Sequence, residues 1–297
     1  MEFTVTGGAG YIGGHLVDAL VNLGSVTVID DFSSGSYMNN QAKYMKADLS
    51  KEVPGIPKGS LVYHLAADPD VRESMAQIGE HFERDVKATL NVAELARVND
   101  ASGIVFLSSS TVYGETESLP TKESEVTRPI SYYGLYKLMG EQVIEFYSRN
   151  YGVPATVLRL ANIIGGRMSH GVIVDFFRKL RNDREKLEIL GNGKQRKSYL
   201  YIQDMVDLLC AVRPKGFNVF NVSNSDWVTV DEIAGIVEGA LGAKPKHVYV
   251  DSGSGRGWEG DVRFMLLDSA LIKSALGWAP KLSSREAVDL AVKDLLK

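Results

Sequence analysis

A serine, a tyrosine and a lysine stand at spacings that suit the removal of a proton from an alcohol. Three serines begin the run Ser-Ser-Ser-Thr-Val-Tyr-Gly at 108–114, and Tyr133 and Lys137 follow as Tyr-x-x-x-Lys. Residues four apart share one face of a helix, so the phenol and the ammonium can act together. A phenol with an ordinary pKa of about 10 is a poor base at neutral pH, but a neighbouring positive charge favours the phenolate and lowers that pKa. We therefore predict hydride transfer at a hydroxyl-bearing carbon, with Tyr133 as base and with Lys137 and a serine of 108–110 as its partners.

The position of the Tyr-x-x-x-Lys pattern gives it weight. A chain with 13 tyrosines is expected to contain about one such pattern by chance, and a surface pair beside a serine-rich turn would look the same. Here the pattern lies downstream of a glycine-rich turn. In addition, the serines at 108–110 lie at the end of a predicted strand, and the ends of such strands are where these sheets bind ligands.

A Gly-x-x-Gly-x-x-Gly turn between a predicted strand and a predicted helix is typical of a dinucleotide site. The first glycine permits the tight turn, the second lets the backbone approach a pyrophosphate, and the third lets the helix pack on the strand. The pyrophosphate would lie at the helix N-terminus, where free N–H groups favour an anion. A tight turn without a ligand is the alternative, and an acid at the end of the next strand argues against it. The expected contacts in this turn are Gly7, Gly10, Tyr11, Ile12 and Gly13.

The acid that follows the second predicted strand selects the cofactor. The carboxylate of Asp30 can accept hydrogen bonds from an adenosine ribose and would repel a 2′-phosphate, so we predict NAD rather than NADP. The contacts expected there are Asp30, Asp31, Phe32, Ser33, Ser34 and Gly35. Further contacts are expected from Asp48, Leu49, Leu65, Ala66 and Ala67 at later strand ends, and from Lys137 on the nicotinamide ribose.

The elements that position these groups alternate between strands and helices. Nearly continuous apolar runs predict strands at 3–6, 25–29, 43–47, 61–64, 103–107 and 155–160, and helical patterns span 11–23, 80–98 and 133–151. Right-handed crossovers between such strands give a doubly wound parallel sheet, the Rossmann architecture. We therefore predict an α/β fold.

A second, smaller α/β domain is expected in the C-terminal half. After residue 163 the elements shorten, and loops rich in glycine, such as 191–194 and 251–257, become frequent. The run at 217–222 is predicted to be a strand that returns to the main sheet. We therefore predict a cofactor domain at 1–162 that includes this strand, and a substrate domain that occupies most of 163–297, with a discontinuous boundary.

Composition limits the expected partners. The 297-residue chain has a net charge of −4, one cysteine, Cys210, in an apolar run, and five scattered histidines. We accordingly expect no nucleic-acid binding, no disulfide and no metal site. We find neither a signal peptide nor an apolar stretch of roughly 18 residues, so we expect a cytoplasmic protein without a membrane partner.

Taken together, the motifs resemble the extended short-chain dehydrogenase/reductase family, and most closely its UDP-galactose (UDP-glucose) 4-epimerase-like members. The resemblance covers essentially the whole chain. The segments that carry it are Thr-Gly-Gly-Ala-Gly-Tyr-Ile-Gly at 6–13, Asp-Asp-Phe-Ser-Ser-Gly at 30–35, Ser-Ser-Ser-Thr-Val-Tyr-Gly at 108–114, Tyr-x-x-x-Lys at 133–137, Arg-Leu-Ala-Asn at 159–162, Gly-Asn-Gly-Lys-Gln at 191–195 and Gly-Asp-Val at 260–262.

The resemblance implies roles for individual residues. It places the family's catalytic Ser or Thr on Ser109, its base on Tyr133 and its lysine on Lys137. The substrate contacts that it implies are Ser109, Ser110, Tyr133, Asn162 and Met265. The family's diphosphate-binding arginines align with Lys197 and Trp258, and we expect Arg196 and Arg256 to take their place, because a guanidinium suits a diphosphate better than an ammonium does. A helix that carries Asn in the family carries Asp85 here.

The reaction implied is the interconversion of UDP-galactose and UDP-glucose by NAD-dependent oxidation at C4, rotation of the 4-keto sugar and reduction on its other face. Related dehydratases and decarboxylases carry an acid directly before the Val-Tyr pair, where this chain has Thr111. Met265 is flexible and intermediate in size, so N-acetylhexosamine sugars stay open. Three other functions are alternatives. The protein could be a different nucleotide-sugar epimerase, a net NAD-dependent dehydrogenase or, outside the enzymes, a dinucleotide-sensing regulator. Family members commonly dimerise through helices corresponding to 83–100 and 133–151, so a homodimer is expected.

Overall fold

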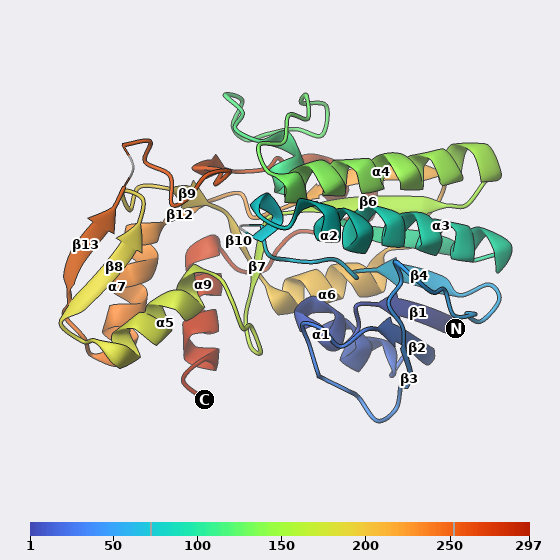
Figure 1. Cartoon of the computed structure of the whole chain (residues 1–297), viewed down its shortest axis with the longest axis horizontal. Coiled ribbons are helices and arrows are strands. Elements are labelled where there is room, and N and C mark those ends of the chain that lie inside the picture. Colours follow the sequence, from blue (N-terminus) through green and yellow to red (C-terminus); the bar gives the residue numbers. More distant parts are fainter. Residues whose placement is uncertain (72, 252) are drawn as a thin grey trace. The chain divides into compact units, whose positions relative to one another are not determined.

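Short apolar strands form a seven-stranded sheet in the computed structural model (Figure 1). In order across the sheet they are β11 (Phe217–Val222), β6 (Ala155–Leu160), β5 (Gly103–Ser109), β4 (Leu61–His64), β1 (Glu2–Thr6), β2 (Ser25–Asp30) and β3 (Lys43–Lys46). Every pair of neighbours from β6 to β3 is parallel. The central strands are buried on both faces, which explains their continuous apolar runs. The predicted doubly wound α/β fold is confirmed.

The order of the strands reverses beside β1. This strand lies between β2 and β4, so the chain leaves it on one side and later returns on the other. In open α/β sheets, ligands bind beyond the carboxyl ends of the strands at such a switch point. The glycine turn follows β1 directly and therefore occupies that position.

Helices cover both faces of the sheet (Figure 1). The pair α3 (Ala88–Val98) and α4 (Tyr132–Tyr151) packs on β4, β5 and β6, while α1 (Tyr11–Leu20) and α6 (Ile202–Ala211) lie on the opposite face. Val62, Ile104 and Phe106 of the sheet share one core with Val92 of α3 and Ile144 of α4. This core anchors the two helices that carry the proposed catalytic residues and their neighbours.

The segment expected as one helix at 80–98 contains three pieces. They are α2 (Ile78–Phe82), a π-helical turn η2 (Glu83–Lys87) and α3. A π-helical turn inserts an extra residue into the helical repeat and changes which side chains face inward. In η2 it buries Asp85 and Val86.

Helix α4 begins and ends at sequence signals that place the Tyr-x-x-x-Lys pair. The hydroxyl of Ser131 accepts a hydrogen bond from the N–H of Gly134 at 3.2 Å, and Gly152 ends the helix with φ +71°. Tyr133 therefore lies in the first turn, and Lys137 lies one turn further on.

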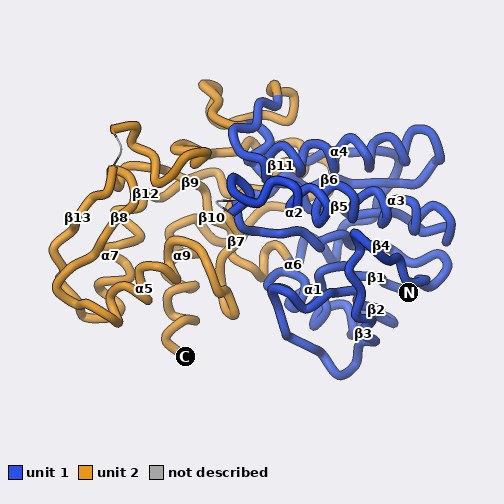
Figure 2. Tube along the Cα trace, in the orientation of Figure 1, with its two compact units in different colours: residues 1–113, 127–160, 206–220 blue, residues 114–126, 161–205, 221–297 orange. Residues whose placement is uncertain are grey.

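The structure describes residues 1–71, 73–251 and 253–297, and Figure 2 shows their two compact units. Unit 1 comprises Met1–Tyr113, Thr127–Leu160 and Val206–Phe220, and unit 2 comprises Gly114–Val126, Ala161–Met205 and Asn221–Lys297. The expected functional division, with a cofactor domain at 1–162 and a substrate domain at 163–297, stays a prediction. In the predicted loop at 251–257, Ser252 lies outside the described residues.

Unit 2 consists of small sheets and four helices within its described residues. Its strands pair as β10 (Tyr199–Tyr201) with β7 (Asn162–Ile164), as β12 (Val228–Thr229), β9 (Arg196–Lys197) and β14 (Phe264–Met265), and as β13 (Lys246–Val250) with β8 (Lys186–Leu190). Its helices are α5 (Val172–Asn182), α7 (Val230–Leu241), α8 (Ala270–Leu276) and α9 (Ser284–Asp294). Capping boxes at Thr229 and Ser283 begin α7 and α9. Elsewhere in the chain, η1 (Glu73–Met75) and η3 (Ser110–Tyr113) are short 3₁₀ turns.

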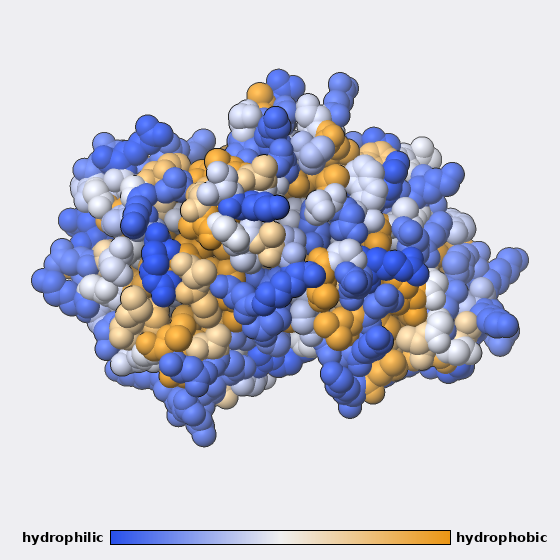
Figure 3. Space-filling model, turned by 180° about the vertical axis from the view of Figure 1, so that it is seen from behind, coloured by the Kyte–Doolittle hydropathy of each residue, from blue (hydrophilic) through white to orange (hydrophobic). Residues whose placement is uncertain are grey.

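The surface mixes residue types. On the face that Figure 3 shows, hydrophobic residues lie in separate groups among hydrophilic ones. Among the described helices, none combines the length and apolar composition needed to cross a bilayer.

Candidate active site

The glycine turn of unit 1 has no room for side chains. Gly7 has φ +72°, and a Cβ on it would lie 2.7 Å from the backbone nitrogen of Ala66. A Cβ on Gly13 would overlap the Gly7 carbonyl oxygen. Among the described residues, no side chain caps the N-terminus of α1. The turn therefore offers bare backbone at the N-terminus of a helix, where a dinucleotide pyrophosphate can approach closely.

Asp30 ends β2 and holds the turn in shape. Its Oδ2 accepts a hydrogen bond from the Ala9 N–H at 2.9 Å, and its Oδ1 accepts one from the Phe32 N–H at 2.8 Å. Burial raises the pKa of this carboxyl above its ordinary value, while the two N–H groups lower it. A carboxylate oxygen has a second lone pair, so Asp30 can still accept hydrogen bonds from a ribose.

The backbone beyond β4 lies against the same turn. The N–H of Leu65 donates to the Thr6 carbonyl at 3.1 Å, and the N–H of Ala66 donates to the Thr6 hydroxyl at 3.3 Å. The loop after β2 also approaches the turn, because a Cβ on Gly35 would overlap the Ala9 carbonyl oxygen. The remaining predicted NAD contacts in these segments are close to the residues just described in the sequence. They are Gly10, Tyr11, Ile12, Asp31, Ser33, Ser34 and Ala67.

Asp48 and Leu49 are held by local interactions. Hydrogen bonds from Lys51 and from Ser50 lower the pKa of Asp48 to about 2, so this carboxylate is charged. Leu49 is buried in the core beneath α3. A backbone contact at this strand end remains compatible with a bound adenine.

Ser109, Tyr133 and Lys137 come together within unit 1. Tyr133 is hydrogen-bonded to Ser109, and the Nζ of Lys137 lies 5.7 Å from the centre of the Tyr133 ring. Lys137 is buried and donates to the Leu107 carbonyl at 2.9 Å. The hydroxyl of Thr111 donates to the Ser109 hydroxyl at 3.0 Å. The serine thus comes from the end of β5, and the tyrosine and the lysine come from one face of α4. Ser110 follows Ser109 as the first residue of η3.

Burial controls the charge of this group. Burial raises the pKa of the Tyr133 phenol above its ordinary value, the charge of Asp85 raises it further, and the hydrogen bond to Ser109 lowers it. Burial also lowers the pKa of the Lys137 ammonium, which the carboxylates of Asp85 and Glu141 raise. The phenol therefore needs added positive charge nearby to act as a base.

A buried ion pair that sequence analysis did not identify connects the elements that carry Ser109, Tyr133 and Lys137. The guanidinium of Arg159 in β6 donates to both oxygens of Glu141 in α4, with Nη2 to Oε2 at 2.7 Å and Nε to Oε1 at 3.0 Å. The Ser108 hydroxyl donates to the same carboxylate, and Arg159 Nη1 donates to the Tyr113 hydroxyl at 2.8 Å. The pair ties α4 to β5 and β6. The sequence signal that could have revealed this ion pair is an arginine inside an otherwise apolar strand.

Asn162 and Met265 are joined through Ser198 within unit 2. The Nδ2 of Asn162 donates to the Ser198 carbonyl at 3.1 Å, and the Ser198 N–H donates to the Met265 carbonyl at 3.1 Å. Met265 is buried, at 6% exposure. These two predicted substrate contacts therefore lie on either side of one residue.

Arg196 lines a pocket of about 360 Å³ in unit 2. Its guanidinium lies 4.7 Å from the centre of the Trp227 ring and 5.3 Å from that of Phe264. Arg263 and Lys194 line the same pocket, so three cationic side chains surround it. Sequence analysis missed Arg263, although this residue directly follows the Gly-Asp-Val motif.

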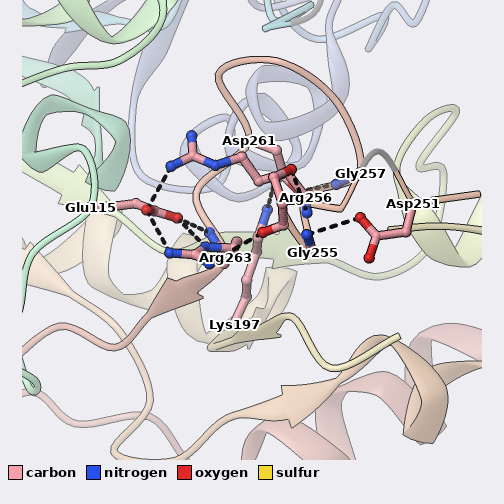
Figure 4. A network of polar contacts seen from close by, with 9 residues as sticks. Glu115, Lys197, Asp251, Gly255, Arg256, Gly257, Asp261 and Arg263 are labelled. Atoms are coloured by element: carbon pink, nitrogen blue, oxygen red, sulfur yellow. Dashed lines mark hydrogen bonds and ion pairs between the residues drawn. The ribbon is translucent and has the colours of Figure 1, made fainter. Parts of the chain in front are cut away.

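Arg256 has a different partner (Figure 4). Its Nη2 lies 2.7 Å from Oε2 of Glu115, and Arg263 donates to the same carboxylate from Nε at 2.8 Å and from Nη2 at 3.0 Å. Burial opposes ionisation of Glu115, but the two arginines hold the pKa of its carboxyl below its usual value. Glu115 therefore fixes both guanidinium groups.

Lys197, which occupies a position where the resembled family has arginine, is also paired. Its Nζ lies 2.6 Å from Oδ1 of Asp261, and Oδ2 of Asp261 accepts a hydrogen bond from the Gly257 N–H at 3.0 Å (Figure 4). The ammonium is thus neutralised by the Gly-Asp-Val motif itself.

Comparison with known sequences identifies one family. A family model described as the NAD dependent epimerase/dehydratase family matches residues 3–223. A putative UDP-glucose 4-epimerase of Methanocaldococcus jannaschii is 32% identical over 301 residues, which cover 97% of this chain and 96% of that protein. The UDP-glucose 4-epimerase of Mycolicibacterium smegmatis is 30% identical over 312 residues, which cover 99% of this chain and 98% of that protein.

Solved structures share the fold over the full length. A crystal structure of a UDP-galactose 4-epimerase is 41% identical with a TM-score of 0.88, covering 100% of this chain and 99% of that one. The UDP-glucose 4-epimerase of Thermotoga maritima with UDP-glucose is 31% identical with a TM-score of 0.90, at the same coverage. A UDP-N-acetylglucosamine 4-epimerase of Methanobrevibacter ruminantium, in complex with UDP-N-acetylmuramic acid, is 27% identical with a TM-score of 0.89, covering 99% of this chain and 98% of that one.

Proposed function

The chain belongs to the NAD-dependent epimerase/dehydratase family, and from this premise we propose that it interconverts UDP-galactose and UDP-glucose by inverting the configuration at C4. That it is an NAD-dependent epimerase follows from the family and from its epimerase relatives. The family does not specify the substrates, and the choice of galactose and glucose is our proposal.

The observation that carries the proposal is the group formed by Ser109, Tyr133 and Lys137. A phenol that is hydrogen-bonded to a serine, with a buried ammonium 5.7 Å from its ring, is equipped to exchange a proton with an alcohol. A protein that only sensed a dinucleotide would not need this group.

The residues of unit 1 fit NAD. The glycine turn is a cradle that a Cβ at Gly7 or Gly13 would fill, and Asp30 has lone pairs left for ribose hydroxyls. A carboxylate at that position would repel the extra phosphate of NADP. When bound, NAD accepts a hydride from the sugar carbon and returns it.

We assign the proton steps to Tyr133. Its phenolate takes the proton of the sugar 4-hydroxyl as C4 is oxidised, and the same phenol returns that proton after the 4-keto sugar has turned. Ser109 donates a hydrogen bond to the sugar oxygen and orients it. Lys137 stabilises the phenolate by its charge and binds the nicotinamide ribose. The proton and the hydride both come back to the sugar, so the reaction is redox-neutral.

We assign the UDP diphosphate to the arginines of unit 2. Arg196 lines the pocket that Arg263 shares, and Arg256 is held close to Arg263 by Glu115. Planar guanidinium groups suit diphosphate oxygens through paired hydrogen bonds. Asn162 and Ser110 are assigned to the sugar.

A second substrate class is supported by Met265. This side chain is flexible and unbranched, and it can adapt to a substituent at C2 of the sugar. A similar structure is that of a UDP-N-acetylglucosamine 4-epimerase. N-acetylhexosamine sugars are therefore the first alternative to plain hexoses.

We also propose a homodimer that forms through α3 and α4. On the outer side of these helices, Leu90 is 45% exposed and Phe146 is 53% exposed. Val86, Met139 and Val143 line a pocket beside them. An apolar surface of this kind is typical of a contact between subunits.

The test is to incubate the purified protein with UDP-galactose without adding NAD, and to look for UDP-glucose. We expect conversion without accumulation of NADH. The Tyr133→Phe variant, at equal concentration, should show little conversion. Conversion of N-acetyl sugars alone would favour the alternative substrate class, and NADH formed in step with product would identify a dehydrogenase. If no UDP-sugar were converted, even with NAD added, the proposal would be wrong.

A further inference from the structure

The segment between β2 and β3 lies against the glycine turn. We call residues 31–42 the strap, and it begins with the predicted NAD contacts at 31–35. The N–H of Tyr37 donates to the Ala9 carbonyl at 3.3 Å, and a Cβ on Gly35 would overlap that same oxygen. The strap is therefore in close contact with the backbone that we assign to NAD.

Beyond this contact, the side chain of Tyr37 lies along one face of α1. Gly14 and Asp18 are four residues apart in this helix and share that face. A Cβ on Gly14 would lie 2.9 Å from Cδ1 of the Tyr37 ring, so the ring fills the space that a side chain would need. The Tyr37 hydroxyl donates to Oδ1 of Asp18 at 2.7 Å.

The conformation of α1 does not require a glycine at position 14. Gly14 is absent from the glycines with positive φ, and glycine weakens the interior of a helix relative to alanine. Its consequence in the structure is the space that the Tyr37 ring occupies. The helix thus gives up some of its own stability at the point where the strap packs on it.

The carboxylate of Asp18 also holds a second residue of the strap. The Nδ2 of Asn39 donates to Oδ1 of Asp18 at 2.8 Å, and the Asn39 N–H donates to the hydroxyl of Tyr44 in β3 at 2.9 Å. Hydrogen bonds to a carboxylate are stronger than those between neutral groups. Asp18 therefore connects two residues of the strap to α1.

We propose that Gly14 and Asp18 are positioning residues that fasten the strap, through Tyr37, against bound NAD and thereby slow the release of the cofactor. How often a loop opens depends on the few contacts that hold it, and NAD can leave only when the segments around it move. The proposed reaction is redox-neutral, so one molecule of NAD can serve many turnovers. The proposal concerns retention of the cofactor and rests on the assignment of NAD to the glycine turn.

The first test is Tyr37→Phe, which keeps the ring on Gly14 and removes the bond to Asp18. Protein loaded with radiolabelled NAD is mixed with excess unlabelled NAD, and we expect release of the label to be about three- to tenfold faster than from the wild type. The matched control is Tyr249→Phe, because Tyr249 is an exposed residue of β13 that donates to Oδ1 of Asp231 at 3.0 Å. The control should release NAD at the rate of the wild type. A lower Tm without faster release in Tyr37→Phe would overturn the proposal, since a purely structural role predicts that result.

The second test is Gly14→Ala, made in the wild type and in Tyr37→Ala. Alanine favours the helix, but its methyl group displaces the Tyr37 ring, so we expect NAD to leave the wild-type background about threefold faster or more. In Tyr37→Ala the ring is absent, and Gly14→Ala should leave the release rate unchanged. Equal acceleration in both backgrounds would overturn the proposal, because the methyl group would then act on the cofactor directly. No acceleration in either background would overturn it as well.

These measurements are independent of the sugar substrate. If the wild type converts no UDP-sugar, the proposed function fails, and the release rates still decide whether Gly14 and Asp18 retain NAD. A wild-type protein that does not retain labelled NAD would overturn the proposal about the strap, whatever sugars it converts when NAD is supplied.

Discussion

The side chains proposed for catalysis depend on their neighbours for their charge. Lys137 is buried and Tyr133 is half-buried, and loss of solvent disfavours the charged form of each, so the pKa of the phenol is raised and that of the ammonium is lowered. Each group therefore works through the charge of the other. A single substitution in this set should act on the pH dependence of the reaction as well as on its rate.

Lys137→Met tests how the charge of the Tyr133 phenol depends on the neighbouring ammonium. Removal of the ammonium raises the pKa of the Tyr133 phenol, so the phenolate forms at higher pH. We expect kcat at neutral pH to fall by about 10²-fold or more, and the acidic limb of the profile to move to higher pH. A profile that keeps its shape while its height falls would contradict the assigned role of the lysine.

Arg256→Ala tests the assignment of the diphosphate. The loss of a charge-assisted pair with a phosphate costs about 1.5–3 kcal/mol, so KM for the UDP-sugar should rise by about tenfold or more while NAD stays bound. Arg181→Ala, an exposed arginine of α5, is the control and should leave KM unchanged. An unchanged KM in Arg256→Ala would remove Arg256 from the site and leave Arg196 and Arg263 as the diphosphate ligands.

At the scale of elements, the junctions between strands and helices carry the function. The glycine turn joins β1 to α1, and the Glu141–Arg159 pair joins α4 to the sheet. Both junctions are tightly packed, so each responds to small changes in shape or charge.

Gly13→Ala tests the first junction. The added methyl group would overlap the Gly7 carbonyl oxygen, and relief of such overpacking costs about 1–3 kcal/mol in the turn proposed to bind NAD. The purified variant should contain less NAD than the wild type, as measured by release on denaturation. Gly235→Ala in α7, where a Cβ meets nothing within 4 Å, should keep its NAD. Full NAD content in Gly13→Ala would place the cofactor elsewhere.

Glu141→Gln tests the second junction. Breaking a buried ion pair leaves Arg159 without its counter-charge, and we expect the free energy of unfolding to fall by about 3 kcal/mol or more. Glu145→Gln on the same helix breaks only an exposed pair with Arg149 and should cost less than about 1 kcal/mol. Urea unfolding of the two variants measures both values. Equal decreases in the free energy of unfolding would show that the buried pair stabilises the fold no more than the exposed pair does.

At the scale of the whole molecule, the outer face of α3 and α4 determines the proposed assembly. Phe146→Glu places a charge on that apolar face, and we expect it to shift a homodimer to monomer in sedimentation, because an unpaired charge cannot be buried at low cost. Val126→Glu, at a position that is 59% exposed in unit 2, is the control and should keep the mass of the wild type. A monomeric wild type would reject the homodimer.

The sequence by itself determined the parallel sheet, the glycine turn and the spacing of Tyr133 and Lys137 on one helix. These features depend on local rules: apolar runs form buried strands, glycine permits a positive φ and close backbone approach, and residues four apart share a helix face. The predicted strands agree with the observed ones to within two residues at each end. Each of these signals lies within a short, continuous stretch of chain, so no knowledge of the fold was needed to find it.

The tertiary structure alone decided which distant charges meet. Glu141 binds Arg159, Glu115 binds both Arg256 and Arg263, and the π-helical turn η2 directs Asp85 inward beside α4. The partners of Glu115 lie about 140 residues further along the chain, and a residue's type does not specify which distant group it contacts. Burial then alters the pKa of each group, because it depends on the packing of whole elements. The charge on the pair proposed for catalysis is therefore a property of the folded chain and not of its motifs.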